Sequence, residues 1–129
     1  MIGGRVLDSS AVRAFVGQRS VYVSALVWTA TEEDIVLLIP ATVLTEVRAD
    51  ADEMARAVLD VLLGLPVTVV DPLEAGRAAE VADLLGEVGA GDLASAHGAA
   101  CALDRLWPLV TGAPSRYEAV PGLVVEQLP

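Results

Sequence analysis

The fold is indicated first by one stretch near the start of the chain, Gly4-Arg5-Val6-Leu7-Asp8-Ser9-Ser10. Val6 and Leu7 are typical of the end of a buried strand, and Asp8 follows them at once. The next run, 11–16, has the composition of a helix, and a serine hydroxyl of Ser9 or Ser10 is expected to cap it. Because open α/β sheets keep ligands at the carboxyl ends of their strands, Asp8 is the first candidate site residue.

The length and composition of the chain predict one domain over residues 1–129, since domains often have about 100–150 residues. Hydrophobic residues make up 54% of the chain and aromatic residues only 4%, so the core must consist of Val, Leu and Ala. No apolar run reaches the roughly 18 residues of a membrane helix, and we expect no signal peptide. Cys101 is the one cysteine, which excludes an internal disulfide and is consistent with a cytoplasmic protein.

The charge of the chain is strongly acidic. Its formal net charge is -10, and all eight basic residues are arginines. Such a chain lacks the basic surface of a general nucleic-acid binder. A contact with RNA would therefore have to be local, through a metal ion or a partner's basic surface. The alternative explanation of the acidic charge is that it only keeps an apolar-rich chain soluble.

Short apolar runs predict the strands, and amphipathic segments between them predict the helices. The segment 19–31 also alternates like a strand, but we favour a helix. Five strands separated mostly by helices indicate an α/β fold with a mainly parallel sheet and helices on both faces. We expect strands at 6–7, 36–39, 67–70, 109–111 and 123–125. Helices are expected at 11–16, 19–31, 41–48, 50–62, 73–85 and 93–106, with Gly17 and Gly64 as stops and a glycine-rich break over 86–91.

Three acids are candidates for one site at the edge of this sheet: Asp8, Glu46 in the helix after the second strand, and Asp92 at a later helix start. Carboxylates that converge from separate segments hold Mg²⁺ or Mn²⁺. An ion held in this way lowers the pKa of bound water and stabilises charge on a phosphate. Two of these acids also have a plainer interpretation: Asp92 as a helix N-cap and Glu46 as a solvated helix residue. Asp8 has the strongest claim of the three, because its apolar strand should otherwise end in a turn residue.

Three segments together carry a resemblance to a known family: RVLDSSAVRAFV (5–16), IPATVLTEV (39–47), and GAGDLASAHGAACALDRLWPLVTGAPSRYEAVPGLVVEQLP (89–129). The chain resembles PIN domains, specifically VapC-like toxins of toxin–antitoxin pairs, over essentially its whole length. The resemblance implies a PIN-like three-layer α/β/α fold and cleavage of RNA with Mg²⁺ or Mn²⁺. It also implies a homodimer and a small antitoxin partner.

The resemblance also assigns roles to particular residues. It implies that Asp8, Glu46 and Asp92 are the catalytic metal ligands. Ser10 and Thr111 would be supporting residues that hydrogen-bond the acids or the metal-bound water.

One position departs from the family. After the fourth strand the family usually has Thr, a small residue and Asp, whereas this chain has Thr111-Gly112-Ala113. Ala113 offers no oxygen, and Ser115 is a weak candidate to hold a water in its place. A second interpretation is therefore a degenerate PIN domain that binds without cutting and acts as a regulatory protein.

A third interpretation, a signalling receiver that accepts a phosphoryl group on Asp8, requires a lysine near the end of the chain. This chain has no lysine, which argues against that interpretation.

Several other residues have structural interpretations that we prefer. His97 is expected to be a structural histidine, and Cys101 a small buried side chain. Trp28 and Trp107 are expected to anchor packing. Three arginines flank the expected site and are candidates for phosphate contacts: Arg13, Arg48 and Arg116.

Overall fold

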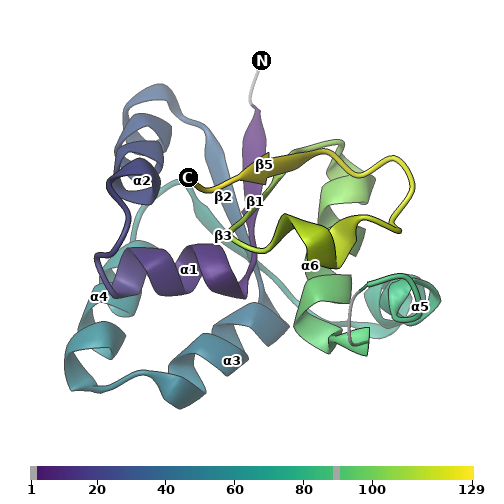
Figure 1. Cartoon of the computed structure of the whole chain (residues 1–129). Coiled ribbons are helices and arrows are strands. Elements are labelled where there is room, and N and C mark those ends of the chain that lie inside the picture. Colours follow the sequence, from purple (N-terminus) through teal and green to yellow (C-terminus); the bar gives the residue numbers. More distant parts are fainter. Residues whose placement is uncertain (1–2, 89–90) are drawn as a thin grey trace.

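The computed structural model describes residues 3–88 and 91–129, and a five-stranded sheet forms its centre (Figure 1). The strand order is β3-β2-β1-β4-β5, and each neighbouring pair is parallel. The strands are β1 (Gly4–Leu7), β2 (Val36–Pro40), β3 (Thr68–Asp71), β4 (Leu109–Thr111) and β5 (Val125–Gln127). The predicted α/β fold with a mainly parallel sheet is confirmed. Since β1 lies in the middle, Asp8 follows the central strand.

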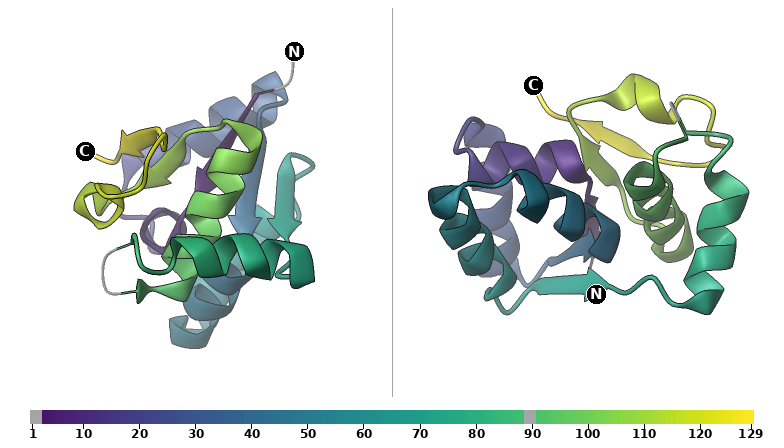
Figure 2. Two further views of the ribbon diagram at one scale, coloured as in Figure 1. Left: turned by 90° about the vertical axis from the view of Figure 1, so that its right-hand side faces the viewer. Right: turned by 90° about the horizontal axis from the view of Figure 1, so that it is seen from below.

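Helices cover both faces of the sheet, as Figures 1 and 2 show. Helices α1 to α4 pack on one face, and α5 and α6 pack on the other. The helices are α1 (Ser9–Val16), α2 (Val21–Glu33), α3 (Ala41–Asp50), α4 (Glu53–Leu63), α5 (Ala75–Leu84) and α6 (Leu93–Arg105), and a short 3₁₀ turn η2 (Pro114–Tyr117) follows β4.

The alternation of side chains along the strands divides the core into two parts. Successive strand residues point to opposite faces, so neighbours in the sequence enter different clusters. Leu7 belongs to the cluster under α1–α4, and Val6 belongs to the cluster under α5 and α6. Leu37 and Leu38 divide in the same way. Burial on both faces explains why the central strands are continuous apolar runs.

The start of α1 differs from the prediction. Neither Ser9 nor Ser10 is the N-cap; Asp8 is, and its Oδ1 accepts a hydrogen bond from the backbone N–H of Ala11 at 3.0 Å. A carboxylate one position earlier takes the free amide of the first turn, because Asp caps as well as Ser does. Gly17 ends the helix, as predicted.

The next two helices also differ at their junction. Asp50 does not open the second helix, because it is the last residue of α3. Asp52 caps α4 instead, and its Oδ1 accepts from the Ala55 N–H at 2.8 Å. Gly64 ends α4, as predicted.

Helix α2 confirms the helical interpretation of 19–31, but the prediction for Trp28 is wrong. The buried face of α2 consists of Val23, Val27 and Ala30, which are spaced by four and three residues. Trp28 points away from that face and is 69% exposed. Trp107 does pack: a Cβ on Gly4 would lie only 2.5 Å from its ring, so the bare glycine backbone makes room for the indole.

The last strand begins two residues later than predicted. Leu109 pairs with Val125 and Thr111 with Gln127, so the register with β4 sets β5 at Val125–Gln127 rather than at 123–125. The glycine-rich break predicted over 86–91 includes residues 89–90, which lie outside the described residues. Within the described ranges, no helix combines the length and the apolar character needed to cross a bilayer.

Candidate functional site

Asp8 lies at the carboxyl end of β1 and is only 4% exposed. Its Oδ1 accepts hydrogen bonds from the Ser10 hydroxyl at 2.6 Å and from the Ala11 N–H at 3.0 Å. Its Oδ2 accepts from the Tyr117 hydroxyl at 2.8 Å. The N-cap position therefore fixes one side of the carboxylate, and Tyr117 fixes the other.

Ser10 and Thr111 join Asp8 in one hydrogen-bonded network. The two hydroxyl oxygens of Ser10 and Thr111 lie 3.3 Å apart. Ser10 Oγ also accepts from the Gly112 N–H at 2.8 Å, and Thr111 Oγ1 accepts from the Ala113 N–H at 2.9 Å. The network arises because β1 and β4 are neighbours and end at the same edge of the sheet. It brings both predicted supporting residues to Asp8.

Asp92 occupies the N-cap position of α6, but its side chain makes no capping hydrogen bond. Instead it accepts a short hydrogen bond from the Ser95 hydroxyl and pairs with Arg116 Nη1 at 2.8 Å. Burial alone would raise the pKa of Asp92, but the hydrogen bond from Ser95 and the charge of Arg116 outweigh it and hold the pKa below its usual value. Asp92 is therefore ionised at neutral pH.

Tyr117 is a site residue that the sequence reasoning missed. It is 2% exposed, and its hydroxyl donates to Asp8 while the preceding residue, Arg116, pairs with Asp92. Burial and the negative charge of Asp8 raise the pKa of Tyr117, so the hydroxyl stays protonated and acts as a donor. Two successive residues of η2 thus connect two of the predicted acids. A tyrosine in the short turn after β4, at the edge of the sheet where Asp8 is expected, was the signal available in the sequence.

Glu46, the third predicted acid, lies on α3 and contacts a different helix. Arg13 Nη2, from α1, lies 3.2 Å from Glu46 and 2.9 Å from Asp50. The side chains of Arg13 and Glu46 are 36% and 37% exposed. Glu46 is therefore connected to Asp8 only indirectly: it contacts Arg13 on α1, and Asp8 caps that helix.

The structure does not place the three predicted acids within a single coordination sphere. Among the His, Cys, Asp and Glu side chains of residues 3–88 and 91–129, the one group of three with ligand atoms within 4.8 Å of one another lies elsewhere, at Asp71, His97 and Cys101. The donor chemistry of Asp8, Glu46 and Asp92 fits a hard cation, since carboxylate oxygens suit Mg²⁺ and Mn²⁺. Guanidinium groups lie against two of these acids, which shows that this edge accepts positive charge. The predicted ligand set remains a prediction.

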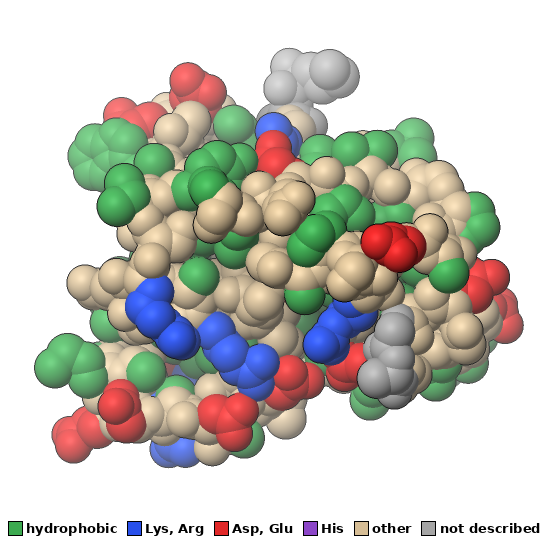
Figure 3. Space-filling view, viewed as in Figure 1, with side chains coloured by type: hydrophobic (Ala, Val, Ile, Leu, Met, Phe, Trp, Pro, Cys, Tyr) green, Lys and Arg blue, Asp and Glu red, His purple; other side chains and the backbone are tan. Residues whose placement is uncertain are grey.

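Basic side chains gather beside this edge despite the acidic chain. Figure 3 shows arginines in a row across the face that carries α1. Arg13 and Arg19 line two neighbouring hollows next to α1, and the second hollow is also lined by Ser10 and Gly112. Two of the three flanking arginines, Arg13 and Arg116, contact predicted acids. Arg48 is paired instead with Asp60 of α4, at 2.6 Å.

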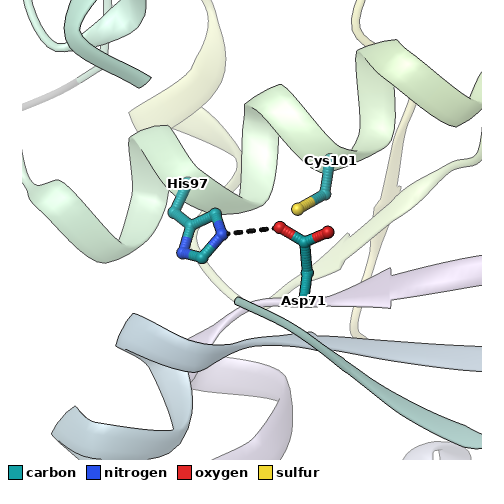
Figure 4. Close-up of side chains that lie close together, drawn as sticks. All are labelled: Asp71, His97 and Cys101. Atoms are coloured by element: carbon teal, nitrogen blue, oxygen red, sulfur yellow. Dashed lines mark hydrogen bonds and ion pairs between the residues drawn. The ribbon is translucent and has the colours of Figure 1, made fainter. Parts of the chain in front are cut away.

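A second cluster of polar side chains lies at the carboxyl end of β3 (Figure 4). His97 Nε2 is 2.9 Å from Asp71 Oδ2, and His97 Nδ1 is 2.8 Å from the Thr42 hydroxyl. Cys101 follows His97 by one helical turn on α6. His97 and Cys101 are fully buried. Both ring nitrogens of His97 have partners, as expected of a structural histidine, and the predicted burial of Cys101 is confirmed.

Arg77 completes this cluster and argues against a metal there. Its Nε and Nη2 lie 3.0 and 3.3 Å from the two carboxylate oxygens of Asp71. Burial acts to raise the pKa of Asp71, but the hydrogen bonds from His97 and Arg77 hold it below its usual value. Burial also raises the pKa of the Cys101 thiol, so the sulfur stays protonated. A guanidinium already neutralises the carboxylate, and the thiol is a poor ligand in that form.

Part of this cluster leaves a signal in the sequence. Asp71 is the last residue of β3, at the same edge of the sheet as Asp8, and His97 and Cys101 stand four residues apart, on one face of a helix. Their partnership depends on how α6 packs across the sheet. We interpret the cluster as a buried network that fixes α5 and α6 against the end of β3.

Comparisons with known proteins identify the fold. No family model matches the sequence, and no relative was found among curated proteins. A chain of VapBC2 from Rickettsia felis, bound to a DNA fragment from its promoter, has a TM-score of 0.74 and 16% identity, over 98% of this chain and 99% of that chain. A chain of DNA-bound VapBC from Salmonella typhimurium has a TM-score of 0.68 and 18% identity, over 98% of both chains. FitAcB from Neisseria gonorrhoeae has a TM-score of 0.65 and 19% identity, over 94% of this chain and 95% of that one. The likeness confirms the PIN-like α/β fold that the sequence resemblance implied.

Proposed function

We propose that this protein is a metal-dependent endoribonuclease of the VapC-like toxin type. The observation that carries the proposal is the network at the carboxyl edge of β1 and β4. There Asp8 is held by Ser10 and Tyr117, and the neighbour of Tyr117 holds Asp92. Fold likeness alone does not define an activity, so the side chains at this edge must account for it.

Each side chain of this edge has a proposed role. Asp8, Glu46 and Asp92 would hold Mg²⁺ or Mn²⁺. Such an ion, when bound, supplies a Lewis acid for the phosphate and lowers the pKa of bound water. Ser10 and Tyr117 fix the orientation of the Asp8 carboxylate, which preorganises it for a cation. Because Tyr117 stays protonated, it serves as a hydrogen-bond donor rather than as a base.

A second candidate function is binding without cleavage. Both oxygens of Asp8 already accept hydrogen bonds, and the residue at the usual fourth acidic position is Ala113. The backbone N–H of Ala113 donates to Thr111, and its methyl group offers no ligand. A degenerate PIN domain with this arrangement would act as a regulatory protein.

Protein partners are part of the proposal. Two of the similar structures are VapBC complexes, which supports a cognate antitoxin for this chain. The exposed Trp28 on α2 offers apolar surface that a protein partner would bury. We further propose a homodimer and action in the cytoplasm. Light scattering of the purified protein tests the dimer, and a monomer at micromolar concentration would contradict it.

The first experiment is a calorimetric titration with Mn²⁺, run with and without a short RNA because phosphate oxygens often complete such sites. Saturable binding that is lost in Asp92→Asn, together with cleavage of RNA, supports the nuclease. Asp60→Asn is the matched control, since Asp60 is an exposed acid paired with Arg48 on α3. Binding that survives in Asp92→Asn contradicts the ligand set. No binding and no cleavage, even with RNA present, favours the regulatory protein.

A further inference from the structure

We infer that Arg13 is an exchangeable counter-ion of the site, and this inference rests on the proposed function. Arg13 neutralises Glu46 while no divalent cation is bound. Once a cation takes Glu46, the freed guanidinium joins Arg19 in binding the phosphodiester backbone of RNA. Arg13 and Arg19 are then substrate-binding residues, and Arg13 also couples metal uptake to RNA binding.

The contacts of Arg13 are suited to such an exchange. One nitrogen, Nη2, contacts both Glu46 at 3.2 Å and Asp50 at 2.9 Å. Asp50 is 71% exposed, and the other two side chains are about one-third exposed. Ion pairs this open to water contribute little free energy, so a divalent cation can displace the guanidinium from Glu46 at low cost.

Arg13 contacts Glu46 and also lines the hollows beside α1. It follows Asp8 by five residues on α1, which is a rise of about 7.5 Å along the helix. Arg13 and Arg19 line both hollows beside α1. The second hollow also includes Ser10, whose hydroxyl donates to Asp8. A strand of RNA with one phosphate at the acids would thus continue past both arginines.

Arg19 supplies a second cation for the phosphate backbone. Within residues 3–88 and 91–129 it makes no ion pair, and it is exposed. A guanidinium is a forked donor that fits phosphate oxygens. Because the chain has a net charge of -10, a contact with RNA must be local, and Figure 3 shows arginine side chains gathered on the face that carries α1.

The test measures two affinities in the same set of variants. Mn²⁺ binding is measured by calorimetry. RNA binding is measured by fluorescence anisotropy, in Mn²⁺ and over a range of salt, with a single-stranded phosphorothioate RNA of about ten nucleotides that resists hydrolysis. Arg5→Ala is the matched control. The Arg5–Glu126 pair has a similar distance, 3.3 Å, and similar exposure, 30% for both side chains, but Arg5 lies in β1, away from its carboxyl end.

The expected effects of Arg13→Ala have opposite signs. Mn²⁺ binding tightens by about two- to fivefold, because Glu46 loses a competing cation. RNA binding weakens severalfold, and the slope of log affinity against log salt falls by about 0.7, the value for one phosphate contact on a single strand. Arg19→Ala lowers the RNA slope equally and leaves Mn²⁺ affinity unchanged. Arg5→Ala changes neither affinity.

Other outcomes overturn the inference in distinguishable ways. If Asp92→Asn abolishes Mn²⁺ binding but Arg13→Ala alters neither affinity, Arg13 is not a counter-ion and the proposed nuclease stands. If the wild type binds no Mn²⁺ even with RNA, the proposed function fails and the inference fails with it. Arg13→Gln repeats the measurement with a neutral polar side chain should the alanine variant not fold. Asp50→Asn, which loosens Arg13 without touching Glu46, is expected to strengthen RNA binding.

Discussion

Replacing Asp71 by asparagine tests whether the buried network at the end of β3 stabilises the fold. Asp71 accepts hydrogen bonds from Arg77 and His97, and its side chain is 10% exposed. Asparagine keeps the shape of the side chain and removes its charge. Its NH₂ group would then face a donor of Arg77 or of His97, so at least one buried donor loses its acceptor.

The structure sets the size of the expected loss. Removing one partner of a buried ion pair costs about 3–5 kcal/mol when the other charge is left uncompensated. The charge of Arg77 would still be compensated in this variant, because Glu80 and Asp104 lie 2.6 and 3.3 Å from it. We therefore expect the free energy of unfolding to fall by about 2–3 kcal/mol at pH 7, near the value of hydrogen bonds to charged groups. For a domain of this size the midpoint of thermal unfolding should fall by about 6–12 °C.

The loss should depend on pH with a definite sign. The folded pKa of Asp71 lies below its unfolded value, so its ionisation adds stability above the unfolded pKa. That contribution disappears as pH falls through the folded pKa, below about pH 4. Wild type and Asp71→Asn should therefore differ most near neutral pH and converge in acid.

Urea unfolding followed by circular dichroism, from pH 7 down to pH 3, measures both effects. Asp60→Asn is the control. Asp60 pairs with Arg48 at 2.6 Å but is 63% exposed, so its replacement should cost less than about 1 kcal/mol. A variant at Asp71 that is as stable as the control, or a difference from wild type that does not shrink in acid, would refute the reasoning.

Four further predictions concern the site and its surroundings. Asp8→Asn should weaken Mn²⁺ binding more than about tenfold relative to Asp71→Asn, measured by calorimetry; equal effects would count against a site at Asp8. Tyr117→Phe, which removes one donor to Asp8, should weaken Mn²⁺ binding by about tenfold in the same assay, and unchanged binding would mean that Tyr117 only packs. Ala113→Asp should tighten Mn²⁺ binding and raise ribonuclease activity; no change in either would show that residue 113 is not the fourth position. Cys101 should react with a thiol reagent only as the protein unfolds, because burial shields it and raises its pKa; fast reaction of the folded protein would contradict this.

Local patterns were sufficient to predict the sheet and most helices. The run at 36–39 is apolar without interruption, and Leu109 and Val110 are both fully buried, which fits central strands buried on both faces. Gly17 and Gly64 end helices because glycine breaks the apolar pattern and suits a helix end. The position of Asp8 at the carboxyl end of a buried strand was predictable, and that strand is the middle one of the sheet.

Features that depend on packing between distant segments could not be predicted in the same way. Tyr117 reaches Asp8 across 109 positions in the sequence, and Asp71 meets His97 across 26. Contacts between residues so far apart in the sequence produce no periodic pattern from which they could be predicted. The exposure of Trp28 shows the same limit, since α2 buries a narrow face of small aliphatic residues and the large aromatic residue lies outside it.

The charges around Asp8, Glu46 and Asp92 bear on the proposal that these three acids hold a metal ion without a fourth. Arg13 and Arg116 each pair with one predicted ligand, so the three carboxylates and two guanidinium groups leave one net negative charge. A divalent cation gains little attraction from such an edge while both arginines stay in place. RNA phosphate changes this balance, because it attracts the arginines away from the acids and brings oxygen ligands of its own. With Ala113 in place of a fourth acid, we expect the metal to bind mainly together with RNA. The affinity for Mn²⁺ should therefore be weaker without RNA than with RNA present.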